Sequence, residues 1–196
     1  MNMFKKLLAA AVLATASIAV AAPVAAAQGT KVVVIDQARV MRESLGGKDI
    51  QAKLQGIEDA IAREMKPTAD SLTSEGKAIE AKSANMTDEA IRADTALQAE
   101  VQAYVAKAQQ FNQRRQVASQ EIQLTERKAW SDFFRALQPV LQEVVTETGA
   151  QVMMDRSDLI FADPAIDSTA LVISKLDARS PTMVVTRQTA PTQPQQ

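Results

Sequence analysis

The sequence has no cysteine and no histidine among its 196 residues. Without cysteine the chain forms no disulfide, and it has no thiol to carry the lipid of a lipoprotein. Without histidine it lacks the usual general base at neutral pH and a frequent metal ligand. These two absences exclude Cys–His pairs, Ser–His–Asp triads and the usual zinc sites.

Glycine is also scarce, with six residues scattered along the chain. No glycine-rich phosphate loop, no G-x-S-x-G and no calcium-loop spacing is present. A hydrolase built on two carboxylates would need both acids to converge in a cleft, and nothing in the pattern predicts one. We therefore predict no catalytic residues, no metal site, no cofactor and no enzymatic activity.

The first 27 residues have the pattern of an export signal. Lys5 and Lys6 form a basic start, residues 7–20 are apolar, and Ala25 to Ala27 supply small residues for cleavage. We predict cleavage between Ala27 and Gln28 and a periplasmic protein; the alternative is an uncleaved anchor. Loss of both lysines changes the net charge from −1 to −3, which gives no support for nucleic-acid binding.

A short β-strand is predicted in KVVVIDQARVM, residues 31–41, with Asp36 as the cap of the helix that follows. We assign 28–36 to the first strand of a small body. A lone strand needs a partner for its backbone groups. Residues 151–155 and 159–161 are two further short apolar runs around a turn at 156–158. We predict that they form a β-hairpin which, with a short helix from Asp167 to about Leu176, completes the body over 150–178.

Between these segments lies helical sequence, residues 37–149. Apolar residues recur at heptad spacing in both halves, with a helix–helix turn at about 84–88 and a stop at Gly149. We predict an antiparallel coiled-coil hairpin that forms an arm, with a bend near Pro67. Trp130, Phe133 and Phe134 are expected to pack where the arm meets the body.

The fold class is therefore α+β and mostly α. Residues 32–35 are apolar on both faces of the strand, which is typical of a strand buried on both sides. So small a sheet cannot supply that cover, and we predict that other copies of the chain complete it. The predicted oligomer interface consists of Val32, Val34, Val152, Met154, Leu159 and Phe161. Residues 179–196, rich in proline and glutamine, are predicted to be a disordered tail.

The chain resembles the Skp/OmpH family of periplasmic chaperones, also called seventeen-kilodalton-protein-like. The resemblance lies in KVVVIDQARVM, in AQVMMDRSDLIFADPAIDSTALVISKLD and in the long hairpin between them, about residues 31–178. It implies a jellyfish-like homotrimer in which three arms hang from a shared β body. It also implies that the arms enclose unfolded outer-membrane proteins without ATP and prevent their aggregation.

Within the arm, the candidate client-binding residues are Met65, Ile79, Met86, Ile91 and Tyr104. They could contact a client or pack in the hairpin seam, and the sequence favours packing for Ile79, Ile91 and Tyr104 and exposure for Met86. Acidic residues outnumber basic ones near the tip, which argues against contact with anionic lipid or lipopolysaccharide. The alternative function is a non-catalytic coiled-coil adaptor or structural protein of the cell envelope.

Overall fold

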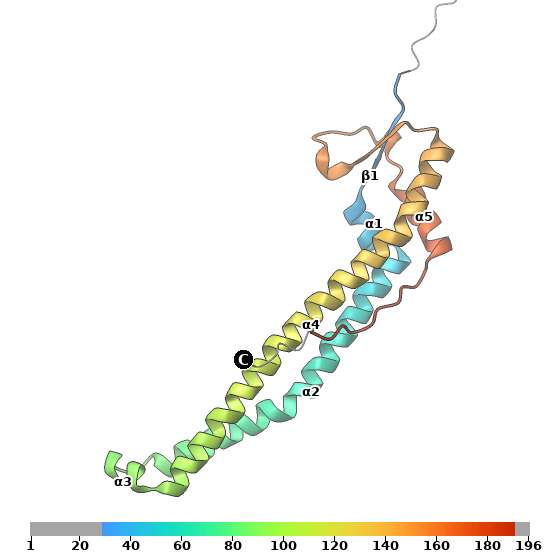
Figure 1. Cartoon of the computed structure of the whole chain (residues 1–196). Helices are drawn as coiled ribbons and strands as arrows, with labels where there is room; N and C mark the ends of the chain where they lie inside the picture. Colours follow the sequence, from blue (N-terminus) through green and yellow to red (C-terminus); the bar gives the residue numbers. More distant parts are fainter. Residues whose placement is uncertain (1–28, 191–196) are drawn as a thin grey trace, which may run out of the picture.

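The computed structural model describes residues 29–190, which form a small base and one long helical arm (Figure 1). The predicted signal peptide and the last six residues lie outside this range. The elements in chain order are β1 (Val32–Ile35), α1 (Gln37–Glu43), α2 (Leu45–Ser83), α3 (Asp88–Ala93), α4 (Thr95–Thr148), β2 (Val152–Asp155), a 3-10 turn at Arg156–Asp158, a second at Pro164–Ile166, and α5 (Thr169–Arg179). In the described part of the chain, no helix is both long and apolar enough to span a bilayer.

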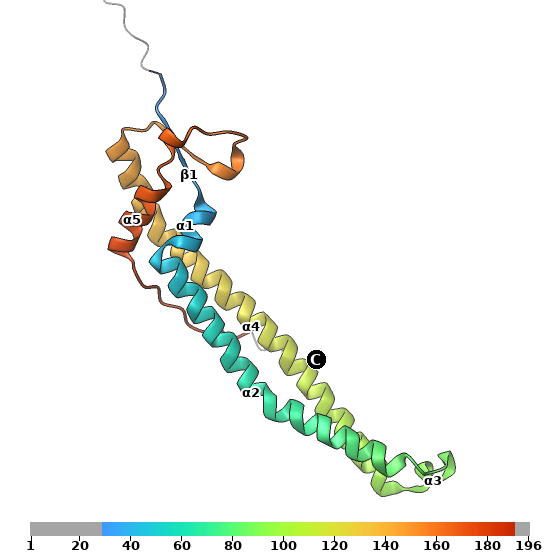
Figure 2. The same cartoon turned by 180° about the vertical axis from the view of Figure 1, so that it is seen from behind.

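The arm consists of α2 and α4, which run side by side in both views (Figures 1 and 2). The turn between them is capped as predicted, since the hydroxyl of Thr87 accepts a hydrogen bond from the backbone of Ala90. Gly149 ends α4 in the left-handed conformation, with φ 64°. The α2 helix contains Pro67 and changes direction in its middle (Figure 1), as expected for a proline that removes one helical hydrogen bond.

Each half of the arm contains one break that the periodicity did not predict. Ser44 separates α1 from α2 and caps α2, and Asp94 separates α3 from α4 and caps α4. Both residues are extended, with ψ of 152° and 94° respectively. Short polar side chains compete with the helix by bonding nearby backbone groups, which explains breaks at these residue types.

The partner of β1 is β2, and the two strands are parallel, with Val32 opposite Val152 and Ile35 opposite Asp155. Parallel pairing requires a long crossover connection, and here the whole helical arm is that connection. Because α4 returns past the level of the sheet before Gly149 reverses the chain, β2 starts beside the start of β1. A single parallel bridge joins Val34 to Asp167 on the strand's other side.

The predicted β-hairpin over residues 151–161 is wrong for the single chain. Residues 159–161 form no strand, and Ile160 and Phe161 project into solvent. The bridge to Asp167 and the bond from the Ser168 amide to the Val34 carbonyl occupy that edge of β1. The 3-10 turn at Arg156–Asp158 follows β2 directly, and residues 159–161 form no ladder with the outer edge of β2, so the described sheet has two strands.

The core lies where the arm joins the base. Ile35, Ile50, Phe133, Val144 and Leu176 are buried there, together with neighbours from α1 and α5. The rings of Trp130 and Phe133 pack edge to face, with their centroids 5.5 Å apart. This agrees with their predicted place where the arm meets the body. Phe134 packs edge to face on Phe133, with ring centroids 5.8 Å apart, but stays 40% exposed and so lies at the edge of the core.

The disordered tail predicted for 179–196 is wrong over its first part. Arg179 belongs to α5, and residues 180–190 lie along the arm as an extended segment (Figure 2). The prediction rested on the low hydrophobicity and the proline content of residues 179–196. In the structure, however, the segment buries Met183 and pairs Arg187 with two acids of the arm. Residues 191–196 lie outside the described part.

Candidate functional site

The distal arm contains two shallow hollows between its helices. One, of about 400 Å³, is lined by Ile79, Ile91, Leu97 and Val101. The second, of the same size, lies beside it and shares Ile79, with Tyr104 on its opposite wall. Three of the predicted client-binding residues thus lie together in a continuous half-buried surface near the tip.

Tyr104 owes its position to a glycine on the facing helix. Its hydroxyl oxygen would lie 3.3 Å from a Cβ placed on Gly76, so a larger residue there would displace the ring. The ring therefore packs across the seam and also borders the hollow. Packing and surface contact are therefore both available to Tyr104. One part of its side chain packs against α2, and another part borders the hollow.

Met65 and Met86 lie elsewhere. Met65 borders a separate hollow of about 360 Å³ with Phe111 and Arg114, closer to the bend in α2. Met86 lies at the helix–helix turn and is half-buried rather than exposed as predicted. The five predicted residues consequently divide into a distal group of three and two single positions.

Sequence reasoning missed three exposed valines on α4. Val101, Val105 and Val117 are each more than one third exposed. Val105 and Val117 lie off the heptad seam, and an apolar residue outside the seam was the signal that could have identified them. Val101 and Val105 lie one turn apart and extend the exposed apolar surface beside the distal hollows, whereas Val117 lies on a different face of α4.

Ion pairs join the two helices of the arm near the distal hollows. Lys107 on α4 donates to Ser71 at 2.7 Å and to Glu75 at 2.5 Å, and Lys82 bonds Glu100 at 2.5 Å. The hydrogen bonds from Lys107 and then Ser71 lower the pKa of Glu75 below its ordinary value. These contacts neutralise charges close to the hollows, so the walls that remain are mainly apolar.

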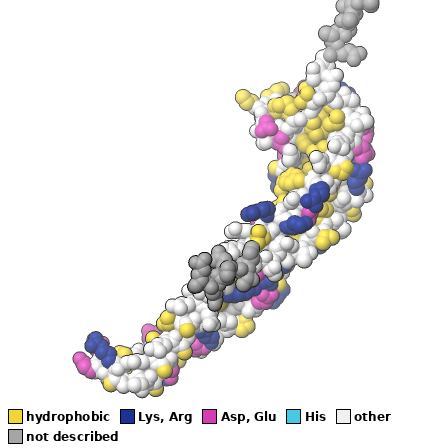
Figure 3. Space-filling view, viewed as in Figure 1, with side chains coloured by type: hydrophobic (Ala, Val, Ile, Leu, Met, Phe, Trp, Pro, Cys, Tyr) yellow, Lys and Arg dark blue, Asp and Glu magenta, His cyan; other side chains and the backbone are white. Residues whose placement is uncertain are grey.

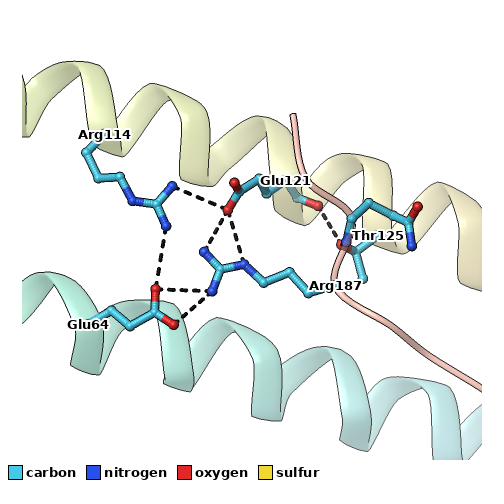
Figure 4. A network of polar contacts seen from close by, with 6 residues as sticks. Glu64, Arg114, Glu121, Thr125 and Arg187 are labelled. Carbon is cyan, nitrogen blue, oxygen red and sulfur yellow. Dashed lines mark hydrogen bonds and ion pairs between the residues drawn. The ribbon is translucent and has the colours of Figure 1, made fainter. Parts of the chain in front are cut away.

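A charged cluster lies closer to the base and includes Glu64, three residues before Pro67 in α2 (Figure 4). The guanidinium of Arg187 donates to Glu64 at 2.8 Å and to Glu121 at 2.7 Å. Arg114 lies on the other side of both acids. Its guanidinium nitrogens are 3.5 Å from a carboxylate oxygen of Glu64 and 3.4 Å from one of Glu121. Burial by itself raises the pKa of Glu121, but the bonds and charges of Arg187 and Arg114 hold that pKa below its usual value.

The base carries the largest exposed apolar side chains. Ile160 is fully exposed and Phe161 is 82% exposed, while Val152 and Met154 on β2 are more than one third exposed. Figure 3 shows hydrophobic side chains gathered over the base end of the molecule. Val34, by contrast, is fully buried within one chain, so it offers no surface to a second copy and its assignment to the interface is wrong.

Within residues 29–190, no group of three acidic side chains is arranged to hold a metal ion. The arrangement instead consists of apolar hollows, neutralised charges and an exposed apolar base. Exposed apolar surfaces of this kind often mark sites of contact with other polypeptides.

The fold and these surfaces define a polypeptide-binding protein with a helical arm, and comparison with known families gives its class. The chain belongs to the OmpH-like outer membrane protein family, whose model matches residues 31–176. A similar solved structure is that of a candidate outer membrane chaperone (OmpH-like) from Caulobacter crescentus CB15. It is 29% identical, has a TM-score of 0.72, and the match covers 84% of this chain and 94% of that one. No curated protein matches. Membership of this family supports a chaperone role in general terms.

Proposed function

We propose that the protein is an ATP-independent periplasmic holdase that keeps unfolded outer-membrane proteins from aggregating. The observation that carries this proposal is the continuous apolar surface of Ile79, Ile91, Leu97, Val101 and Tyr104 on an arm that projects away from the core. A shallow surface of this kind makes weak contacts and cannot enclose a folded ligand. Weak contacts repeated along several arms hold an unfolded chain through avidity.

The chemistry of the guest fits these contacts. An unfolded outer-membrane β-barrel chain has apolar residues at alternate positions and aggregates in water. Binding to its unfolded state lowers the concentration that is free to aggregate, and no nucleotide is needed for that effect. We place the working unit in a trimer joined through the base, where Val32, Val152, Met154, Leu159 and Phe161 are the proposed contact residues.

The test shortens the arm without disturbing the base. Lys107 bonds Ser71 and Glu75, so residues 73 and 107 lie at the same level of the hairpin. Removing 74–106 and closing the gap with a short glycine-containing turn deletes both distal hollows and leaves the core residues in place. We expect the intact mature protein to suppress light scattering by an outer-membrane barrel diluted from urea, without nucleotide, and the shortened protein to lose most of that effect.

The matched control replaces three exposed polar residues of the removed segment, Ser74, Lys77 and Glu80, with alanine in the intact chain. None of the three lines either distal hollow, so this triple variant should protect as well as the unaltered protein. Equal protection by the shortened protein, with its oligomer intact, would contradict the proposal and favour an adaptor that uses the arm for docking.

A further inference from the structure

The extended segment 180–190 lies against the proximal arm in a way that the proposed function does not explain. Its first close contact is with α2, where a Cβ on Gly46 would lie 2.9 Å from the carbonyl oxygen of Ser180. The absence of a side chain at Gly46 therefore lets the segment approach the helix closely. From there the segment runs along α2 and α4 to Thr189 (Figure 2).

The side chains of the segment alternate in burial. Met183 is 9% exposed and belongs to the core, Val185 packs against that core, and Arg187 enters the acid pair. Val184, between them, is 82% exposed, and Thr186 is exposed as well. Alternation with a period of two is the pattern of an extended strand that binds through one face.

The arm also satisfies main-chain groups of the segment, and those contacts do not depend on side-chain identity. The carboxylate of Asp49 accepts from the Met183 amide at 2.8 Å, and Lys53 donates to the Met183 carbonyl at 2.6 Å. At the other end, the hydroxyl of Thr125 accepts from the Gln188 amide at 2.9 Å. Main-chain bonds combined with pockets at alternate positions are how proteins bind extended peptides of varied sequence.

We call the surface of α2 and α4 that the segment covers the groove of the proximal arm. Its most specific part is the position that binds a cation, which in this chain is Arg187. The side chain of Glu121 is only 9% exposed although it lies on the arm, and both it and Glu64 bond the guanidinium of Arg187. Hydrogen bonds between charged partners are about twice as strong as neutral ones. The groove thus accepts an apolar residue, a second apolar residue two positions later, and a cation two positions after that.

We propose that this groove on the proximal arm is a binding site for extended polypeptide, and that residues 180–190 occupy it as a competitor within the same chain. The guest is a segment of unfolded protein with apolar residues at two alternate positions followed by Arg or Lys at the next. Identifying the guest as a client rests on the proposed function, whereas the site itself does not. Because the tail is tethered, its effective concentration is on the order of millimolar, and a guest binds only by displacing it.

The test uses the full mature chain and, as its probe, a fluorescent synthetic copy of residues 180–190. Arg187→Gln in the protein removes the charge-assisted bonds of the tail but leaves Glu64 and Glu121 in place to bind the arginine of the probe, with Arg114 still on their other side. We expect the variant to bind the probe at least tenfold more tightly than the unaltered chain, measured by fluorescence anisotropy. A probe with Met183→Gln, Val185→Gln and Arg187→Gln should not bind.

Two controls make the result specific. Arg63→Gln changes an exposed arginine next to Glu64 that takes no part in the cluster, and it should leave probe affinity as in the unaltered chain. Adding Glu121→Gln to the Arg187→Gln protein should remove the tenfold gain. If Arg187→Gln loses helical circular dichroism, Arg187→Lys keeps the charge without the planar fork and should give a smaller gain in the same direction.

Equal affinity of the Arg187→Gln and unaltered proteins, or equal binding of the altered probe, would overturn the proposal. The assay contains no outer-membrane client. Failure of the unaltered protein to protect a barrel would therefore overturn the proposed function and leave a positive probe result standing. A negative probe result would likewise leave protection by the distal arm untouched.

Discussion

At the residue scale, one glycine decides how the base connects to the arm. Gly47 lies in the first turn of α2, just after the break at Ser44. A Cβ at this position would lie 1.9 Å from the carbonyl oxygen of Met41 in α1. Because that neighbour is backbone, no side-chain rotation relieves the clash, and the close turn between α1 and α2 requires glycine.

Gly47→Ala should therefore destabilise the protein. Forcing an extra carbon into a packed site costs about 1–3 kcal/mol, so the melting temperature should fall. Gly56→Ala is the matched control, since it lies in the same helix and a Cβ there would meet nothing within 4 Å. That variant should gain up to about 1 kcal/mol, because alanine is the better helix former. A Gly47→Ala protein as stable as the Gly56→Ala protein would refute this account of the junction.

At the scale of single elements, the two helices of the arm differ in continuity. Pro67 lies within α2, which bends, whereas Pro139 in α4 lies between the buried residues Leu137 and Val140. Pro139 is thus surrounded by core packing, but most residues around Pro67 are exposed or half-buried. Local stability should therefore be lowest in α2 just beyond the Arg187 cluster.

Amide hydrogen exchange should be faster over residues 65–70 than over residues 97–122 in the unaltered protein. Pro67→Ala restores the missing hydrogen bond and removes the ring clash, so it should slow exchange at 65–70 and leave 97–122 unchanged. Mass spectrometry of proteolytic fragments measures both segments in one experiment. Equal exchange of the two segments before the substitution would show that Pro67 does not weaken the arm.

At the scale of the whole molecule, the base exposes large apolar side chains, Ile160 and Phe161 among them, and exposed apolar patches often mark sites of association. Phe161→Asp changes a residue that is 82% exposed, so it should not disturb the fold of one chain. If three chains join through the base, the charge will be buried at the interface and the assembly will dissociate. Light scattering should then give the mass of three chains for the unaltered protein and of one chain for the variant.

Val184→Asp is the control for this experiment, because Val184 is equally exposed but lies on the tail. It should keep the mass of the unaltered assembly. A single-chain mass for the unaltered protein would rule out the trimer. A trimeric Phe161→Asp protein would exclude Phe161 from the interface.

The sequence by itself determined the features that depend on neighbours along the chain. Helix periodicity, the caps at Asp36 and Thr87, the stop at Gly149 and the bend at Pro67 arise from local backbone chemistry, and all are present. Only part of the candidate site followed from the same pattern. The grouping of Ile79, Ile91 and Tyr104 depends on how α2 and α4 align across the seam, where Tyr104 packs against Gly76.

Only the tertiary structure decided the features that join distant residues. The parallel pairing of β1 with β2 follows from how far α4 extends past the sheet, and the local sequence of residues 151–161 contains no information about that length. The tail was predicted to be disordered because its own composition cannot form a core. It is ordered because Asp49, Glu64, Glu121 and Thr125, each more than 60 positions away, supply partners for its backbone and for Arg187.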